Sequence, residues 1–339
     1  MFSCLFLFSS SCDSNQEQLS TIGEVVDTHV NQFVDLDGPG LAVAVMHHGN
    51  VIFEKGYGMA DIGAHVNVGR DTRFYLASVS KQITSMAVLL LYEDGLIDLE
   101  DKIVSTFPEA PETWNQITIH HLLTHQSGIV EYLKLPDKAN WTNQDVFNVV
   151  INYDPEFAPG DKYKYSNTGY LLLAMLVERI SGLPFETFVY EKIFSRLGMS
   201  QSMVADPSKP VIPLRAVGYW PDGNLHDYPL LTMGDGGIFS SLNDMEIWLR
   251  SLLNSELLLP ETLDLAFTSY NGRGYGYGWN VGKIKGRKRL YHAGALVGYA
   301  AHVSLISEEE LAVVVLSNGT FREEVPELAE KILFFYLQN

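Results

Sequence analysis

The chain has 339 residues, of which 46% are hydrophobic and 19% are charged, and its formal net charge at pH 7 is −18. This composition is typical of a folded globular protein and disfavours an intrinsically disordered one. Because so acidic a surface repels phosphate backbones, the charge also disfavours a nucleic-acid-binding protein.

The first segment, Met1–Ser11, is apolar and rich in serine, and it ends at Cys12. It resembles a bacterial lipoprotein signal, which predicts a signal over residues 1–12, membrane attachment through a lipidated Cys12, and a location in the bacterial cell envelope, periplasmic or membrane-anchored. The segment is shorter than a normal export signal and has no Lys or Arg before its apolar run, so a truncated or misassigned start is the alternative. Beyond Cys12 the sequence has no cysteine, which excludes a thiol nucleophile, a disulfide or a thiolate metal site there.

The remaining sequence, residues 13–339, alternates between strand and helix patterns and is expected to form a single domain. A helical segment, Leu19–Val34, precedes two strands, Leu41–His47 and Val51–Met59, joined at the turn Gly49-Asn50. Apolar runs followed by stop signals predict helices at Ser78–Glu93, Ile119–Thr124, Asn143–Ile151, Asn167–Ile180 and Asp244–Leu253. Strand patterns return at Tyr277–Val281, Arg289–His292, Tyr299–Ile306 and Leu311–Ser317, before the amphipathic helix Val325–Leu337. This order predicts an α/β (α+β) fold, in which both ends of the chain form one sheet and a mainly helical region, about residues 78–235, is inserted in it.

The first candidate functional residues are Ser78 and Lys81, at the start of a predicted helix. Lys81 is the only charged residue between Phe74 and Tyr92, so the helix and this lysine are expected to be buried. Burial lowers the pKa of a lysine, and a neutral amine on the same helix face is what a serine needs for activation. The helix start also favours developing negative charge on Ser78. From these residues alone, a capping serine beside a surface lysine is an equal alternative.

Two further motifs follow along the chain. Tyr165-Ser166-Asn167 precedes a predicted helix, so Asn167 is a plausible N-cap. Tyr165 is a packing residue unless it reaches Ser78, where a nearby ammonium would lower the pKa of its phenol. His292-Ala293-Gly294-Ala295 stands at the end of a short predicted strand. The pattern His-x-Gly alone is uninformative, because His47-His48-Gly49 also matches it.

Taken in this order, the three motifs resemble those of the class C β-lactamase and DD-peptidase superfamily, the penicillin-binding-protein-like serine hydrolases that include esterases. The resemblance runs from about Leu41 to Gly319. It extends to four flanking stretches: Ile117–Ile129, Phe157–Leu173, Gly236–Asp244 and Tyr275–Trp279. It implies a β-lactamase/transpeptidase-like fold with an antiparallel sheet, and an enzyme that hydrolyses an ester or an amide through an acyl-enzyme.

The resemblance also implies a role for each matched residue. Ser78 is the nucleophile, and Lys81 and Tyr165 share its proton, in proportions that the sequence leaves open. Asn167 orients either the substrate amide or Lys81. The backbone N–H groups of Ser78 and Ala295 form the oxyanion hole. His292 and Gly294 of the third motif line the wall of the site opposite Tyr165. A small-molecule or peptide substrate is expected, with no metal and no cofactor.

The third motif departs from the Lys-Thr-Gly with which relatives that act on β-lactams or D-Ala-D-Ala termini hold a substrate carboxylate. Ala293 has no hydroxyl, and His292 is at most partly charged at neutral pH. Losing one charge-assisted hydrogen bond costs about 1.5–3 kcal/mol. This predicts an esterase or a D-aminoacyl peptidase in preference to an efficient β-lactamase. The basic run Arg287-Lys288-Arg289 is a source of compensating charge, but a solvated hairpin turn is its expected structure.

Other assignments are weaker. The chain has no Gly-x-Ser-x-Gly elbow, which disfavours an α/β-hydrolase. His121 and His125 have metal-ligand spacing but lack the adjacent glutamate of a zinc-protease helix, so they are expected to pack. The rival from another class is a penicillin-binding sensor or scaffold that keeps the fold without hydrolysis. The presence of all four residues Ser78, Lys81, Tyr165 and Asn167 favours the enzyme.

Overall fold

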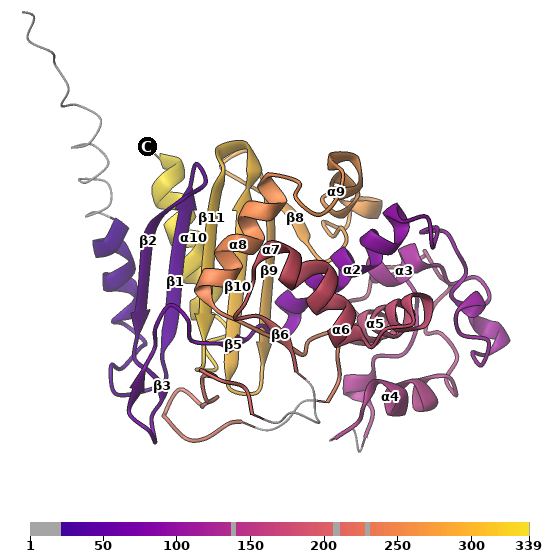
Figure 1. Cartoon of the computed structure of the whole chain (residues 1–339), viewed down its shortest axis with the longest axis horizontal. Coiled ribbons are helices and arrows are strands. Elements are labelled where there is room, and N and C mark those ends of the chain that lie inside the picture. The colour runs from indigo at the N-terminus through magenta and orange to yellow at the C-terminus, as the bar shows by residue number, and fades with distance from the viewer. Residues whose placement is uncertain (1–21, 137–139, 206–210, 228–230, 339) are drawn as a thin grey trace, which may run out of the picture.

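Strands from both ends of the chain form one six-stranded sheet, in the order β2-β1-β11-β10-β9-β8 (Figure 1). Every neighbouring pair runs antiparallel. The strands are β1 (Leu41–His47), β2 (Asn50–Tyr57), β8 (Asn280–Ile284), β9 (Arg287–Leu296), β10 (Tyr299–Ile306) and β11 (Leu311–Ser317). The first strand pairs with the last in the middle of the sheet, which confirms the predicted fold class.

This computed structural model describes residues 22–136, 140–205, 211–227 and 231–338. The predicted signal and Cys12 lie outside the described residues, so membrane attachment through Cys12 stays a prediction. None of the described helices is long and apolar enough to cross a membrane.

Helices cover both faces of the sheet. On one face, the helix over residues 22–30 and α10 (Glu324–Gln338) pack against alternate strand residues such as Val43 and Val315. On the other face, Ala44 and Val314 join the larger core, which also contains helices α2 and α8. Because side chains alternate between faces and both faces are covered, β1 and β11 are apolar in every residue except the last, which is His47 in β1 and Ser317 in β11.

The inserted region is mainly helical and lies beside the sheet. Its helices are α2 (Lys81–Glu93), α3 (Ile119–Leu123), α4 (Asn143–Val150), α5 (Asn167–Ser181), α6 (Phe185–Val189) and α7 (Ser195–Leu197). Two further helices, α8 (Leu242–Leu253) and α9 (Pro260–Ala266), follow this region in the chain. Short strands and turns connect them: β3 (Met59–Asp61), β4 (Val66–Asn67), β5 (Phe74–Tyr75), η1 (Ala77–Ser80), η4 (Tyr132–Lys134), β6 (Met203–Val204) and β7 (Ile238–Ser240). Figure 1 shows α2 at the junction between the sheet and helices α3 to α6. Every residue of α2 from Lys81 to Leu91 is buried there.

Two strand predictions in the C-terminal half are wrong in extent. β9 continues to Leu296, so His292 lies inside a strand and not at its end. β8 begins at Asn280, three residues after the predicted start. The predicted hairpin turn is also wrong, because Arg287, Lys288 and Arg289 are the first residues of β9. Arg289 is only 5% exposed and forms an ion pair of 2.8 Å with a glutamate of α10.

Acid is expected to destabilise the fold through histidines that are buried in their neutral form. Burial lowers the pKa of His292 and His302 from 6.5 to about 3, and the pKa of His125 well below 6.5. Below pH 6.5 the unfolded chain therefore binds more protons than the folded chain, and the free energy of unfolding falls as the pH falls. The measurement is the urea midpoint at about pH 7.5 and about pH 5 for the wild type and for His302→Gln.

Carboxyl groups also titrate between these two pH values, so the wild type alone cannot show the effect of one histidine. The difference in pH dependence between the wild type and His302→Gln isolates the contribution of His302. Gln keeps a polar group beside Arg289 and Ser304, which contact the His302 Nε2 atom at 3.2 and 2.9 Å. The variant is expected to lose less stability between the two pH values than the wild type. Equal losses of stability in the wild type and in His302→Gln would contradict the inference that His302 is buried in its neutral form.

Candidate active site

Ser78 is held where the chain changes from a sheet connection into helix α2. It lies in η1, whose residues precede α2 directly, and Ala77 before it has a left-handed φ of 47°. Strand β9 packs against η1 at Gly294. A Cβ atom at Gly294 would lie 2.4 Å from the Leu76 carbonyl oxygen and 2.8 Å from the Ser78 backbone nitrogen. Glycine therefore permits an approach of two backbones, which brings the Ser78 N–H beside the strand that carries Ala295, the second predicted oxyanion donor.

Lys81 lies entirely inside the protein with its amine directed at Ser78. The Nζ atom is 3.3 Å from Ser78 Oγ, and it donates to Asn167 Oδ1 at 2.8 Å and to the Asp235 backbone oxygen at 2.7 Å. Burial lowers the pKa of Lys81 from 10.5 to about 8, against the opposing effect of the Asp235 and Glu131 carboxylates. At pH 7 roughly a tenth of the amine is then neutral and able to take a proton from the serine.

The ring of Tyr165 lies next to the Lys81 amine, with its centroid 4.9 Å from Nζ. Its hydroxyl is buried beside Ser78 but does not meet hydrogen-bond geometry with any described group. Burial raises the pKa of the Tyr165 phenol, and the neighbouring Ser78 hydroxyl opposes this only in part. The expected lowering of this pKa is therefore wrong, because desolvation outweighs the other effects. The amine, not the phenol, is the group nearer to deprotonation at neutral pH.

Asn167 is the first residue of α5, but it does not cap the helix. The N-cap is Ser166, whose Oγ accepts the Gly169 N–H at 3.1 Å. The prediction that Asn167 is the N-cap is thus wrong, and its side chain is free to reach Lys81. On its other side Asn167 contacts Glu131, which accepts its backbone N–H at 2.6 Å and its Nδ2 amide at 3.1 Å.

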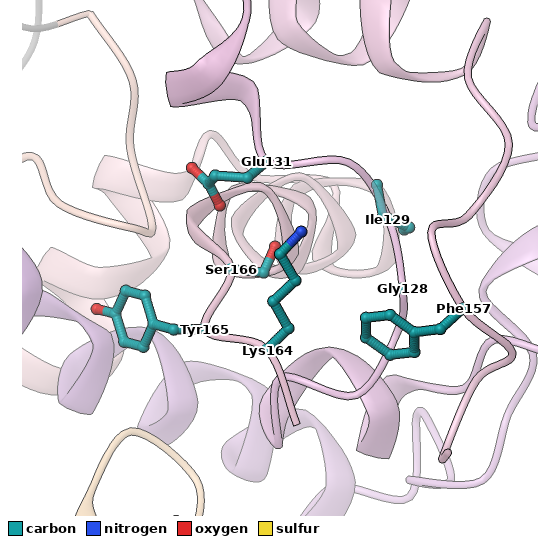
Figure 2. A pocket seen from close by; sticks show the side chains of 7 residues that line it. All are labelled: Gly128, Ile129, Glu131, Phe157, Lys164, Tyr165 and Ser166. Carbon is teal, nitrogen blue, oxygen red and sulfur yellow. The ribbon is translucent and has the colours of Figure 1, made fainter. Parts of the chain in front are cut away.

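A narrow pocket lies behind Tyr165, on the side of Glu131 and Ser166 (Figure 2). It is lined by Gly128, Ile129, Glu131, Phe157, Lys164, Tyr165 and Ser166. In this view the side chains of Lys164 and Tyr165 point in different directions, although the residues are adjacent. The Lys164 amine forms an ion pair with Glu156. Lys164 therefore contributes no unpaired charge beside Ser78.

His292 lies beside Tyr165, with 6.2 Å between the two ring centroids. Its Nδ1 atom lies 2.7 Å from the Ala293 carbonyl oxygen, which can only accept, so Nδ1 carries the proton. Nε2 then accepts from the Tyr275 hydroxyl at 3.1 Å. Burial and the Lys81 charge lower the pKa of His292 to about 3, so the ring is neutral at neutral pH.

The two arginines of the basic run at the start of β9 do not compensate for this neutral histidine. Arg287 forms an ion pair with Glu309, and Arg289 forms an ion pair with Glu330 of α10. Helix α10 covers the face of the sheet opposite to the one on which Ser78 lies. The described residues also contain no group of three metal-ligating side chains. The site as described can thus transfer protons among Ser78, Lys81 and Tyr165, and it offers a substrate carboxylate no charged partner from the third motif.

Sequence reasoning assigned no role in the site to four residues that lie around it: His125, Glu131, Asp235 and Tyr275. His125 does pack, as expected, but its partners are site residues. Its ring lies 4.4 Å from that of Tyr165 and 4.5 Å from that of Tyr275. Its Nδ1 accepts the Ser166 N–H at 3.1 Å. Glu131 and Asp235 stand next to matched stretches in the sequence, and no local pattern marks either of them.

Comparisons with known proteins identify relatives of this chain. Residues 26–336 match the family model described as Beta-lactamase. Penicillin-binding protein 4* of Bacillus subtilis (strain 168) is 28% identical over 320 residues, which cover 84% of this chain and 70% of that protein. The D-aminopeptidase of Gluconobacter oxydans (strain 621H) is 28% identical over 299 residues, which cover 83% of this chain but only 56% of that protein. The structure of the octameric penicillin-binding protein homologue from Pyrococcus abyssi superposes with a TM-score of 0.84 at 26% identity, covering 95% of this chain and 78% of that one.

Proposed function

This chain belongs to the Beta-lactamase family, and from that premise we propose that it is a serine hydrolase that forms an acyl-enzyme on Ser78. One observation carries the proposal. A fully buried amine, Lys81, lies 3.3 Å from Ser78 Oγ, and burial lowers its pKa to about 8. A lysine in this state is a general base for the serine, because its neutral form is populated near physiological pH.

The proposed reaction has two halves. In the first, the Lys81 amine takes the Ser78 proton while Oγ attacks the carbonyl carbon of the substrate. The N–H groups of Ser78 and Ala295 hold the resulting oxyanion. The bond to the leaving group then breaks, and Tyr165, which burial keeps protonated, passes its proton to that group and regains one from Lys81. In the second half, water attacks the acyl-enzyme by the reverse proton path and releases the acid product.

The proposed substrate is an ester or a D-aminoacyl amide, and not primarily a β-lactam. His292 is buried and neutral, and Ala293 has no hydroxyl, so neither holds a substrate carboxylate as Lys-Thr-Gly does. The negative carboxylates of Glu131 and Asp235 act on the same site and disfavour an anionic group further. Similarity to a D-aminopeptidase supports the amide alternative.

Rapid hydrolysis of p-nitrophenyl acetate with negligible hydrolysis of nitrocefin is the expected result for the purified protein. The neutral ester needs no partner for a carboxylate, whereas the cephalosporin carboxylate loses a charge-assisted hydrogen bond, which lowers its reaction by about 10- to 100-fold. The measurement is kcat/KM for both substrates. In Ala293→Thr, the restored hydroxyl is expected to raise penicillin acylation without raising ester hydrolysis. Efficient nitrocefin hydrolysis by the wild type would contradict this account of the third motif.

The similarity to penicillin-binding protein 4* favours one alternative, a sensor or scaffold that binds penicillin without turnover. Such a protein would be labelled once by a fluorescent penicillin and would hydrolyse neither p-nitrophenyl acetate nor nitrocefin. A location in the cell envelope is proposed on the same similarity.

A further inference from the structure

Glu131 contacts Asn167 on the side away from Lys81, and its carboxylate accepts three N–H groups. One oxygen accepts the Asn167 backbone N–H at 2.6 Å. The other accepts the Asn167 Nδ2 amide at 3.1 Å and the Leu133 backbone N–H at 3.3 Å. The residue is only 6% exposed. A buried carboxylate with this set of donors is held in one place and in one orientation.

This contact decides which way the Asn167 amide faces. A carboxylate can only accept hydrogen bonds, so the NH₂ end of the amide must face Glu131. The carbonyl end, Oδ1, then faces Lys81 Nζ at 2.8 Å, where it accepts from the amine. Glu131 engages the NH₂ group of Asn167, and Oδ1 accepts from the Lys81 amine, which favours orientation of Lys81 as its role.

We propose that Glu131 is a positioning residue for the general base: by fixing the amide of Asn167 with Oδ1 toward Lys81, it holds the lysine amine against Ser78 Oγ. The inference rests on the proposed function. If the amide were reversed, its NH₂ group would donate to the lone pair that Lys81 needs in order to take the serine proton. The amine would then be a poorer base at every pH, including the pH range in which it is fully neutral.

The loop that carries Glu131 is also held by hydrogen bonds that do not involve this side chain. The Tyr132 N–H donates to Thr168 Oγ1 at 2.9 Å, and the Thr168 hydroxyl donates to the Val130 carbonyl oxygen at 2.8 Å. These two bonds tie the loop to the first turn of α5 on both sides of Glu131. A substitution at Glu131 is therefore expected to change the amide of Asn167 without releasing the loop.

The first test compares Glu131→Gln with Asp235→Asn in p-nitrophenyl acetate hydrolysis across the pH range. Both changes remove one negative charge that raises the pKa of Lys81, so both are expected to move the rise of kcat/KM to lower pH. Only Glu131→Gln removes an acceptor from Asn167. The two carboxylate oxygens of Glu131 each accept one Asn167 donor, the backbone N–H or the Nδ2 amide, whereas glutamine has a single carbonyl oxygen. Glu131→Gln alone is expected to lower kcat at the high-pH plateau, by about 10- to 100-fold, with KM little changed.

The second test is a double-mutant cycle with Asn167→Ala. Because Glu131 acts through Asn167, the double variant is expected to be no slower than Asn167→Ala alone. Losses that multiply in the double variant, or a Glu131→Gln plateau equal to that of Asp235→Asn, overturn the inference while leaving the proposed function intact. A folded wild type with no activity and no fluorophosphonate labelling overturns the proposed function itself. If Glu131→Gln does not fold, Glu131→Asp, which keeps the charge but retracts the carboxylate, replaces it in the same cycle.

Discussion

Ser78→Ala is expected to abolish covalent labelling by a fluorophosphonate or a fluorescent penicillin, and to lower ester hydrolysis by roughly 10³- to 10⁶-fold. The hydroxyl of Ser78 is the group that the Lys81 amine faces at 3.3 Å. The sequence after Cys12 has no thiol that can replace it. Removing one hydroxyl group from the half-buried side chain of Ser78 should leave the fold intact, so the loss of activity reports the missing nucleophile.

Ser80→Ala is the matched control for this variant. Ser80 lies two residues further along the same η1 segment and is fully buried, and its Oγ has no hydrogen-bond partner among the described residues. Removing that hydroxyl should leave labelling and hydrolysis close to the wild-type values. Labelling that survives in Ser78→Ala would place the nucleophile elsewhere, and loss of labelling in both variants would point to damage of η1 and not to a missing nucleophile.

The parts of this fold that the sequence predicts well are those in which one local pattern suffices. β1, β10 and β11 have the bounds that their apolar runs predict. A continuous apolar run of seven or eight residues between turns is typical of a buried strand and is short for a helix. For Ser78 and Lys81, the local pattern predicts a shared helix face and a buried lysine. Only the two distant motifs favour a catalytic pair over a capping serine beside a surface lysine.

Irregular segments were harder, because the close approach of distant backbones decides their shape. Tyr277–Trp279 has the aromatic content of a strand and lies outside β8. A Cβ atom at Gly278 would lie 2.6 Å from the Lys81 carbonyl oxygen, so this segment is shaped by contact with α2. Nothing in its sequence gives that contact.

The electrostatics of the site were also beyond local reasoning. Desolvation has the largest effect on the pKa of the Tyr165 phenol, and it raises this pKa, whereas a neighbouring ammonium alone would lower it. Glu131 and Asp235 reach Lys81 from two separate connections, one before η4 and one before β7. Their distance from Lys81 in the sequence hides a proximity that only the packed structure provides, and it is these carboxylates that limit how far burial lowers the pKa of the lysine.

Lys81→Met is expected to lower hydrolysis by about 10²- to 10⁴-fold, the usual contribution of a general base, while the stability of the fold changes little. A fully buried amine is costly to desolvate, and methionine fills similar space without that cost. Against this gain, Asn167 Oδ1 and the Asp235 carbonyl oxygen each lose a donor. An unsatisfied acceptor costs about 1–3 kcal/mol, so the two effects oppose each other.

The pH dependence separates Lys81 from Tyr165 as the base. In the wild type, kcat/KM should rise with pH around an apparent pKa of about 8, since only the neutral amine accepts the proton and burial sets its pKa there. Lys81→Met should lose this rise, whereas Lys164→Met, which removes a lysine paired with Glu156 beside Tyr165, should keep it. A rise in Lys81→Met that lies at a much higher pH would transfer the base role to the Tyr165 phenol, because burial raises the pKa of that phenol.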